Sequence, residues 1–186
     1  MTKANVYVTA GIRVTCKNGK MISDKTFRSK SLVRQWQRAL WAAYSNTAQN
    51  VVDTGNTPRA LNEHSFHCDS VAAGDDYGII LGRDATPVTM ADYVLGTPVV
   101  EGVGVNQLNY ALTVITHAEA AGGDYVQIQR VATNNSAADV TIEEIGLYGL
   151  SAPDAWYFMM IRDVTGPTLV VVGASATVTF QIHNNL

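Results

Sequence analysis

Apolar and polar residues alternate along two neighbouring segments in the second half of the chain, in the pattern of strands that bury one face. Residues 107–118 place apolar side chains at alternate positions from Leu108 to Val114, and residues 125–133 return with apolar side chains on a common face. The segment between them contains two glycines and an aspartate, which is typical of a turn. We therefore predict an antiparallel hairpin with one buried side.

Several other short segments have the composition of strands and are separated by turn signals. They are rich in β-branched and aromatic residues, which favour extended backbone. Roughly seven to nine such strands predict a mainly β protein, and specifically an antiparallel β-sandwich of jelly-roll-like arrangement, rather than alternating βαβ units. The clearest of these segments are residues 6–16, 77–82, 140–150, 155–164 and 168–183.

The most distinctive apolar segment is VTIEEIGLYGL, residues 140–150, which follows the polar turn NNSAAD. A strand there alternates its side chains between two faces, and we predict that Ile145 and Leu147 are buried. Gly146 lies between them. A glycine inside a strand marks a bulge or a close approach of the backbone to a neighbour.

The same segment carries two adjacent carboxylates, Glu143 and Glu144, which must point to opposite faces of a strand. A carboxylate that is buried without a partner is strongly destabilising, so the inward one needs a cation. Arg130 and Arg162 are the candidates. The sequence leaves open which of the two pairs with it.

Residues 29–46 predict the one helix of the chain, an amphipathic helix near the N-terminal end. Leu32, Trp36 and Leu40 recur at four-residue spacing on one face, while arginine and glutamine lie largely on the others. Either serine at the start of the segment can cap it. We therefore divide the chain into an N-terminal arm or hairpin, residues 1–28, and a β-sandwich domain, residues 29–186, that includes this helix.

Composition narrows the classes of protein. The 186 residues are 47% hydrophobic and 16% charged with a formal net charge of −3, which gives no general electrostatic reason to bind nucleic acid. No segment approaches the ~18 apolar residues of a membrane span, and the first twenty residues lack the apolar core of a signal peptide. We expect synthesis in a cytoplasm, no membrane partner, and reduced thiols at Cys16 and Cys68.

Positive charge is concentrated near the N-terminal end, where seven of the thirteen Lys and Arg residues lie between Lys17 and Arg38. Such a run is either a solvated face or a surface that meets an acidic partner or nucleic acid. Aromatic residues beside it, Trp41 above all, suit a protein interface. The candidate partner interface is Lys25, Arg28, Lys30, Arg34, Arg38 and Trp41.

Residues of the kinds that carry catalysis or bind metals are present, but in no recognisable constellation. EHSFHC, residues 63–68, resembles half of a zinc site and lacks a second ligand pair. GVGVNQ, residues 102–107, lacks the third glycine and the following helix of a dinucleotide loop. No nucleophile elbow and no zinc-protease motif occurs. We therefore predict no catalytic residues, no metal site and no cofactor, and a protein that is not an enzyme.

Several segments in consistent order between Ser31 and Ile182 resemble a family of small virion structural proteins encoded by tailed bacteriophages and related viruses. The resemblance implies a β-sandwich subunit that forms homo-oligomers and packs against other virion proteins, major capsid or tail proteins, without catalysis. The implied location is the virion, after synthesis in the host cytoplasm. The segments are SLVRQWQRALWAAYS, VVDTGNTPRAL, YGIILGRDATPVTMADYVLGTPV, GVGVNQLNYALTVIT, RVATNNSAADVTIEEIGLYG, FMMIRDV and VVVGASATVTFQI.

Among virion proteins, a capsid decoration subunit is the preferred interpretation, and a tail, neck or baseplate component is the alternative. The alternative is kept because TNNS…VTIEEIGLYG also resembles stretches of tail-fibre, collar and baseplate proteins. A carbohydrate-binding module is the alternative of another class. In it, Trp156 or Tyr157 stacks on sugars, although a central strand covered on both faces also explains these aromatic residues.

Overall fold

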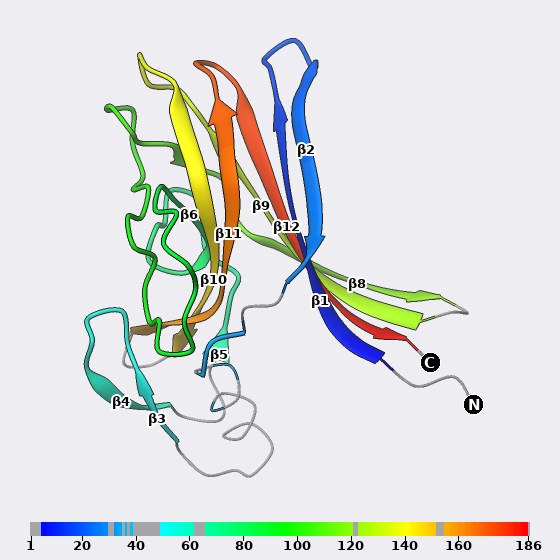
Figure 1. The fold of residues 1–186 in the computed structure, drawn as a ribbon, viewed down its shortest axis with the longest axis vertical. Coiled ribbons are helices and arrows are strands. Elements are labelled where there is room, and N and C mark those ends of the chain that lie inside the picture. The colour runs from blue at the N-terminus through cyan, green and yellow to red at the C-terminus, as the bar shows by residue number, and fades with distance from the viewer. Residues whose placement is uncertain are drawn as a thin grey trace.

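The computed structural model describes residues 5–29, 32–34, 36, 38, 49–61, 66–120, 123–151 and 155–185. These residues form twelve strands arranged in antiparallel sheets, so the prediction of a mainly β protein is confirmed (Figure 1). The strands are β1 (Asn5–Thr15), β2 (Met21–Arg28), β3 (Gln49–Val52), β4 (Pro58–Leu61), β5 (Phe66–His67), β6 (Gly78–Gly82), β7 (Asn109–Tyr110), β8 (Val114–Ala120), β9 (Gly123–Thr133), β10 (Val140–Ser151), β11 (Trp156–Val170) and β12 (Ser175–Asn185).

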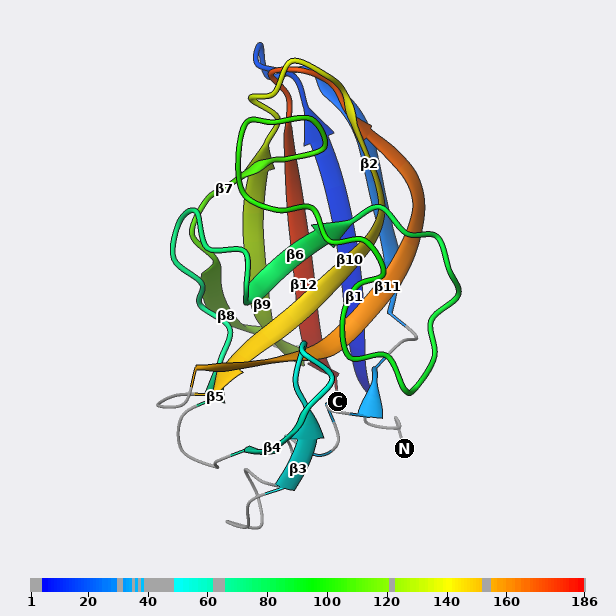
Figure 2. The same cartoon turned by 90° about the vertical axis from the view of Figure 1, so that its left-hand side faces the viewer.

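The larger sheet has six strands in the order β2-β1-β12-β9-β7, and β8 also pairs with β9. The β1–β2 hairpin belongs to this sheet, because β1 pairs antiparallel with β12 from Asn5 to Thr15. The smaller sheet has the order β11-β10-β5, with β6 on β10, and β3 and β4 form a separate pair. Figure 2 shows β6, β10 and β11 crossing in front of β9, β12 and β1.

Side chains of the two sheets meet in one buried cluster. Ile12 of β1 and Phe180 of β12 enter it from the larger sheet, and Leu81 of β6 enters it from the smaller sheet. Ile145 and Leu147 of β10 belong to the same cluster and are fully buried, which confirms their predicted burial. The hydrophobic contact between the two sheets is therefore the main source of stability.

The predicted close approach at Gly146 is also confirmed. A Cβ atom at this position would lie 2.7 Å from the ring of Tyr148 and 3.1 Å from Leu95. The register between β10 and β11 shifts one residue further on, between Leu147 and Tyr148. Glycine is needed because a neighbouring side chain occupies the space of its missing one.

The helix predicted over residues 29–46 is not seen with those bounds. The backbone N–H of Ser29 donates to Val8, Leu32 bridges to Ile161 of β11, and the N–H of Val33 donates to Met160. These bonds to β1 and β11 place Ser29, Leu32 and Val33 outside a helix, so Ser29 does not cap one, and Ser31 lies outside the described residues. Arg34, Trp36 and Arg38 are helical, and the other residues from 35 to 48 lie outside the described residues.

The predicted hairpin over residues 107–133 is confirmed in its pairing of β8 with β9, but its buried face was misassigned. Tyr110 is buried, whereas Leu112 and Val114 are 54% and 46% exposed. The chain leaves the sheet between β7 and β8, and the N–H of Thr113 donates to the carbonyl of Ser70. Ile115 pairs with the buried Ile128 of β9, but it is itself 45% exposed, so neither face of β8 is buried at this point.

Among the described residues there is no helix of the length and apolar character that a membrane crossing requires.

Candidate functional site

The predicted partner interface is divided between two faces of β2. Lys25 points toward β11, where its Nζ donates to the carbonyl oxygens of Gly166 at 3.0 Å and Pro167 at 2.7 Å. Arg28 lies on the opposite face of β2, and its guanidinium stacks over the ring of Tyr7 at 4.7 Å. Lys25 therefore has partners within its own chain, and the two cations do not form one patch.

The other members of that predicted set are also separated. Arg34 is exposed and its backbone N–H donates to Met90, whereas Nη1 of Arg38 donates to the carbonyl of Asn50 at 2.8 Å. Lys30 and Trp41 lie outside the described residues. Arg38 thus ties the end of the segment to the start of the β3–β4 pair.

A surface that sequence reasoning missed lies at the end of the molecule where β1 turns into β2 and β11 turns into β12 (Figure 1). Large apolar side chains are exposed on both turns, and two lysines of the first turn are exposed beside them. The sequence signal was the presence of apolar residues directly next to turn residues. We call this set the tip surface: Lys17, Lys20, Met21, Ile22, Leu169 and Val172.

The charged residues of the smaller sheet form a buried cluster around Arg162 of β11. Its Nε donates to Oε2 of Glu144 at 2.7 Å, and its Nη1 donates to Oδ2 of Asp92 at 2.7 Å. Glu144 is fully buried and also accepts backbone N–H bonds from Asp84 and Thr97. The sequence prediction of a buried glutamate paired with Arg130 or Arg162 is confirmed, with Glu144 and Arg162 as the pair.

The ionisation of this cluster follows from its hydrogen bonds. Burial opposes the charged form of Asp92, but hydrogen bonds from Thr89 and Arg162 outweigh it and lower the pKa of this carboxyl. Burial likewise opposes the charge on Arg162, and its bonds to Asp92 and Glu144 raise the pKa of the guanidinium above its usual value. Asp92 and Arg162 are therefore ionised at neutral pH, and the cluster holds the 84–97 loop against β10.

The second candidate cation, Arg130 of β9, binds carbonyl oxygens and not a carboxylate. Its guanidinium donates to the carbonyls of Ala111, Ile79 and Val71 at 2.8 to 3.1 Å, and stacks over the Tyr110 ring at 4.6 Å. Burial lowers the pKa of Arg130, and Tyr110 is the first of the groups that oppose this shift. Arg130 thus fastens the loops around β6 to the larger sheet.

A hollow lies on the outer face of the larger sheet, the face turned away from β10 and β11. It has a volume of about 300 Å³ and is lined by hydroxyl, amide and charged side chains from β2, β1, β12 and β9. Figure 1 shows that these strands bend and that the outer face lies on the inner side of the bend. We call this feature the outer-face hollow; its lining includes Thr9, Gly11, Arg13, Asp24, Thr26, Gln127, Gln129, Thr177, Thr179 and Gln181.

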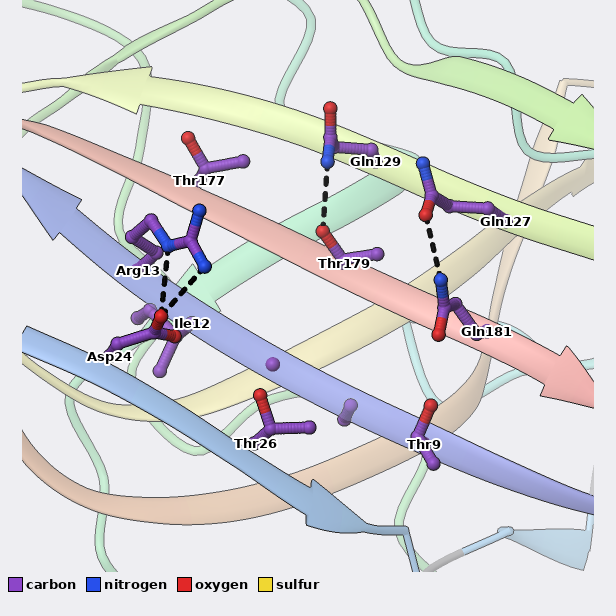
Figure 3. Close-up of a pocket in the computed structure, with 12 residues that line it drawn as sticks. Thr9, Ile12, Arg13, Asp24, Thr26, Gln127, Gln129, Thr177, Thr179 and Gln181 are labelled. Carbon is purple, nitrogen blue, oxygen red and sulfur yellow. Dashed lines mark hydrogen bonds and ion pairs between the residues drawn. The ribbon is translucent and has the colours of Figure 1, made fainter.

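Hydrogen bonds across the strands order the side chains of this hollow (Figure 3). Nε2 of Gln181 donates to Oε1 of Gln127 at 2.8 Å, and Nε2 of Gln129 donates to Oγ1 of Thr179 at 3.0 Å. At the other side, Arg13 donates two hydrogen bonds to Oδ2 of Asp24. The single positive and single negative charge of the lining therefore neutralise each other.

Aromatic rings border one end of the outer-face hollow. Tyr7 of β1 pairs in register with His183 of β12, which in turn pairs with Tyr125 of β9. The Tyr7 and His183 rings are stacked with centroids 4.7 Å apart, and Tyr125 lies 5.6 Å from His183 at a tilt. Nε2 of His183 lies 3.2 Å from Oγ1 of Thr9, which links this row of rings to the hollow.

The aromatic residues predicted to stack on sugars have partners within the chain. Arg59 lies 5.0 Å over the ring of Trp156, and Trp156 packs against a small cluster that contains Phe158. Tyr157 stacks on Tyr77 with centroids 6.0 Å apart. These rings fasten the ends of β10 and β11 to the β3–β4 pair and the loop before β6.

In the described part of the chain, no group of three or more His, Cys, Asp or Glu side chains is placed to hold a metal ion. His67, from the zinc-like segment, contacts Asp69, while Cys68 is buried. No protein-family model, curated protein or solved structure matches the chain. Its function is therefore inferred from its own residues.

Proposed function

We propose that this chain is a non-enzymatic structural protein of a tailed-virus particle, and in the first place a capsid decoration subunit that packs against other virion proteins. The observation that carries the proposal is the tip surface, where large apolar side chains are exposed in or next to two turns at one end of the molecule. Exposed apolar groups rimmed by charge are typical of protein interaction sites. The resemblance of the sequence to small virion proteins supports the same reading.

The fold that we propose for this role is an antiparallel β-sandwich of jelly-roll-like arrangement. Two sheets that share one buried cluster support it, as does the crossing of their strands in Figure 2. A rigid sandwich leaves its turns free to contact neighbours, because the core does not depend on them. Such subunits assemble as symmetric homo-oligomers, which is the oligomeric form that we propose here.

The charge of the tip surface suggests the chemistry of its partner. Lys17 and Lys20 are exposed beside Met21, whereas on the β11–β12 side the carboxylate of Asp139 accepts the N–H of Val172 at 3.0 Å. A partner with an apolar patch, and with acidic groups where it meets the two lysines, is complementary to this surface. We therefore propose that the tip surface contacts the capsid or tail protein that this subunit decorates.

The test is to separate intact particles of the native source from free protein on a density gradient and to measure this chain per major shell subunit. A fixed ratio near one, or a simple fraction of it, supports capsid decoration. A small but constant ratio supports the alternative, a tail, neck or baseplate component. Absence from the particles contradicts both positions.

A second candidate function, carbohydrate binding, is favoured by the outer-face hollow and not by Trp156 or Tyr157. Binding of a ligand in this hollow does not depend on assembly of the protein into a particle.

A further inference from the structure

We propose that the outer-face hollow is a binding site for a neutral saccharide. This inference goes beyond the structural role and does not rest on it, because the hollow lies on the sheet face and not on the turns of the tip surface.

The hydrogen-bonding groups match a polyhydroxylated ligand. Each glutamine carries two amide hydrogens and a carbonyl oxygen with two lone pairs, and each threonine carries a hydroxyl that both donates and accepts. The bond between Gln181 and Gln127 uses one hydrogen of the first and one lone pair of the second. The Gln181 carbonyl oxygen and the Gln127 amide hydrogens therefore remain for sugar hydroxyls, which need donors and acceptors side by side.

The charge of the hollow selects a neutral ligand. Arg13 and Asp24 form a two-bond pair at 3.0 and 2.7 Å that joins neighbouring strands, so neither presents an uncompensated charge. A nucleic acid or phosphate site instead depends on uncompensated Lys and Arg. Arg28, which lies beyond the hollow, stacks on Tyr7.

The shape of the hollow depends on Gly11 in the middle of β1. Its cross-strand neighbours are Thr26 on β2 and Thr179 on β12, so a missing side chain leaves a depression between two hydroxyl-bearing residues. A Cβ atom at Gly11 would meet its nearest atoms at 3.4 Å, so a side chain fits there sterically. Neither steric crowding nor a positive φ angle requires glycine at this position. The need to keep a ligand site open explains why a glycine is found there. The volume of about 300 Å³ is in the range of small-ligand sites.

The row of Tyr7, His183 and Tyr125 gives the site an aromatic border. Amphipathic rings suit a sugar, which presents C–H faces as well as hydroxyls. The row lies two residues along the strands from Thr9 and Gln181, on the same face of the sheet, so one ligand longer than a single ring can contact both the rings and the amides. We therefore assign an oligosaccharide, with one residue over Gly11 and the next toward Tyr125.

The experiment is a glycan array followed by calorimetry with the neutral oligosaccharides that bind, using the full chain and two matched variants. Gly11→Val fills the depression with a residue that favours strands, and we expect it to weaken binding at least tenfold. Thr15→Val changes a residue of the same strand outside the lining, and we expect no change in affinity. Circular dichroism and thermal melting of both variants show whether the fold is kept.

Gln181→Ala provides a variant that does not alter the shape of the backbone. Loss of one neutral hydrogen bond weakens binding by about threefold to tenfold. Side-chain amide signals of Gln127, Gln129 and Gln181 in NMR spectra should shift on addition of the saccharide.

Three results would overturn the proposal: no binding of any neutral glycan by the wild-type chain, equal affinity of the wild-type and Gly11→Val proteins, or tighter binding of a single-stranded oligonucleotide. None of these results bears on the presence of the chain in particles, so the two proposals fail separately.

Discussion

Nε of Arg162 lies 2.7 Å from Oε2 of Glu144, in a pair whose carboxylate is completely buried and whose guanidinium side chain is 4% exposed. Water does not reach this site to replace a lost partner. The carboxylate and the guanidinium therefore depend on each other for compensation of their charges. We expect Glu144→Gln to reduce the free energy of unfolding by about 3 kcal/mol, as is typical when one partner of a buried ion pair is removed. Urea denaturation measures this difference.

The matched control is Glu143→Gln, one residue earlier in β10 on the opposite, half-buried face. We expect it to change the free energy of unfolding by less than about 0.5 kcal/mol. Equal effects of the two substitutions would contradict the structural role of the Glu144 pair.

Asp92 gives the cluster a pH dependence whose sign follows from its lowered pKa. A carboxyl with a lower pKa in the folded state stabilises the fold above its unfolded pKa of about 3.9, and this contribution is lost as the pH falls through the folded value. We expect Asp92→Asn to be less stable than the wild type by about 2 kcal/mol at pH 7. The difference should decrease below about pH 4, and a difference that is constant between pH 7 and pH 2 would exclude the mechanism. Denaturation at a series of pH values measures it.

Arg130 should not tolerate replacement by lysine. Its planar guanidinium reaches carbonyls in several segments at once, whereas an ammonium group has three donors at one point. We expect Arg130→Lys to reduce the free energy of unfolding by about 3 kcal/mol. Amide hydrogen exchange should accelerate around Ser70 and Gly74, whose oxygens accept from the guanidinium. Arg13→Lys, at a largely exposed position, is the control and should have little effect.

The two thiols should differ in reactivity. Both are free, as the sequence predicted, but Cys68 is buried, and burial followed by the nearby Asp69 carboxylate raises the pKa of its thiol to about 12. Only about one in ten thousand molecules then carries the thiolate at pH 8. We expect a disulfide reagent to label Cys16 in the native protein and Cys68 only after unfolding. Rapid labelling of native Cys16→Ser protein would show that Cys68 is accessible.

The tip surface predicts separable effects on assembly and stability. We expect Met21→Asp and Val172→Asp to change the free energy of unfolding by less than about 0.5 kcal/mol, because both side chains are more than half exposed. In particles assembled with these variants, the amount of this chain per shell subunit should fall at least tenfold. Normal incorporation would remove the tip surface as the site of contact.

The sequence predicted well those features that depend on local alternation or on burial. Ile145 and Leu147 are buried between the two sheets, and Tyr148 on the other face of β10 is buried as well, because it packs against Leu95. The pairing of Glu144 with an arginine was predictable because a buried carboxylate requires a cation. The choice of Arg162 over Arg130 was not, because it depends on which strand lies beside β10.

Predictions failed where partners distant in sequence determine the backbone. Leu32 belongs to the predicted helical stripe, yet it forms a β-bridge to Ile161 of β11. The chain leaves the sheet at Thr113, whose N–H donates to Ser70, and both Val114 and Ile115 beyond it are exposed. The outer-face hollow could not be predicted from the sequence, because its residues come from four strands and lie together only when β1 and β12 are neighbours. The one signal in the sequence was a glycine, Gly11, in an otherwise β-branched strand.

The pairing of β1 with β12 also determines when the protein can fold during synthesis. The β1–β2 hairpin leaves the ribosome before the other described strands, but the strand that must lie beside it is completed only after Asn185 has been added. Until then one edge of β1 has unpaired backbone groups, and β9 lacks the same neighbour. Contacts of such long sequence separation slow folding and prolong the exposure of strand edges that aggregate. The nascent chain therefore needs β1 to be protected from aggregation until β12 has been synthesised.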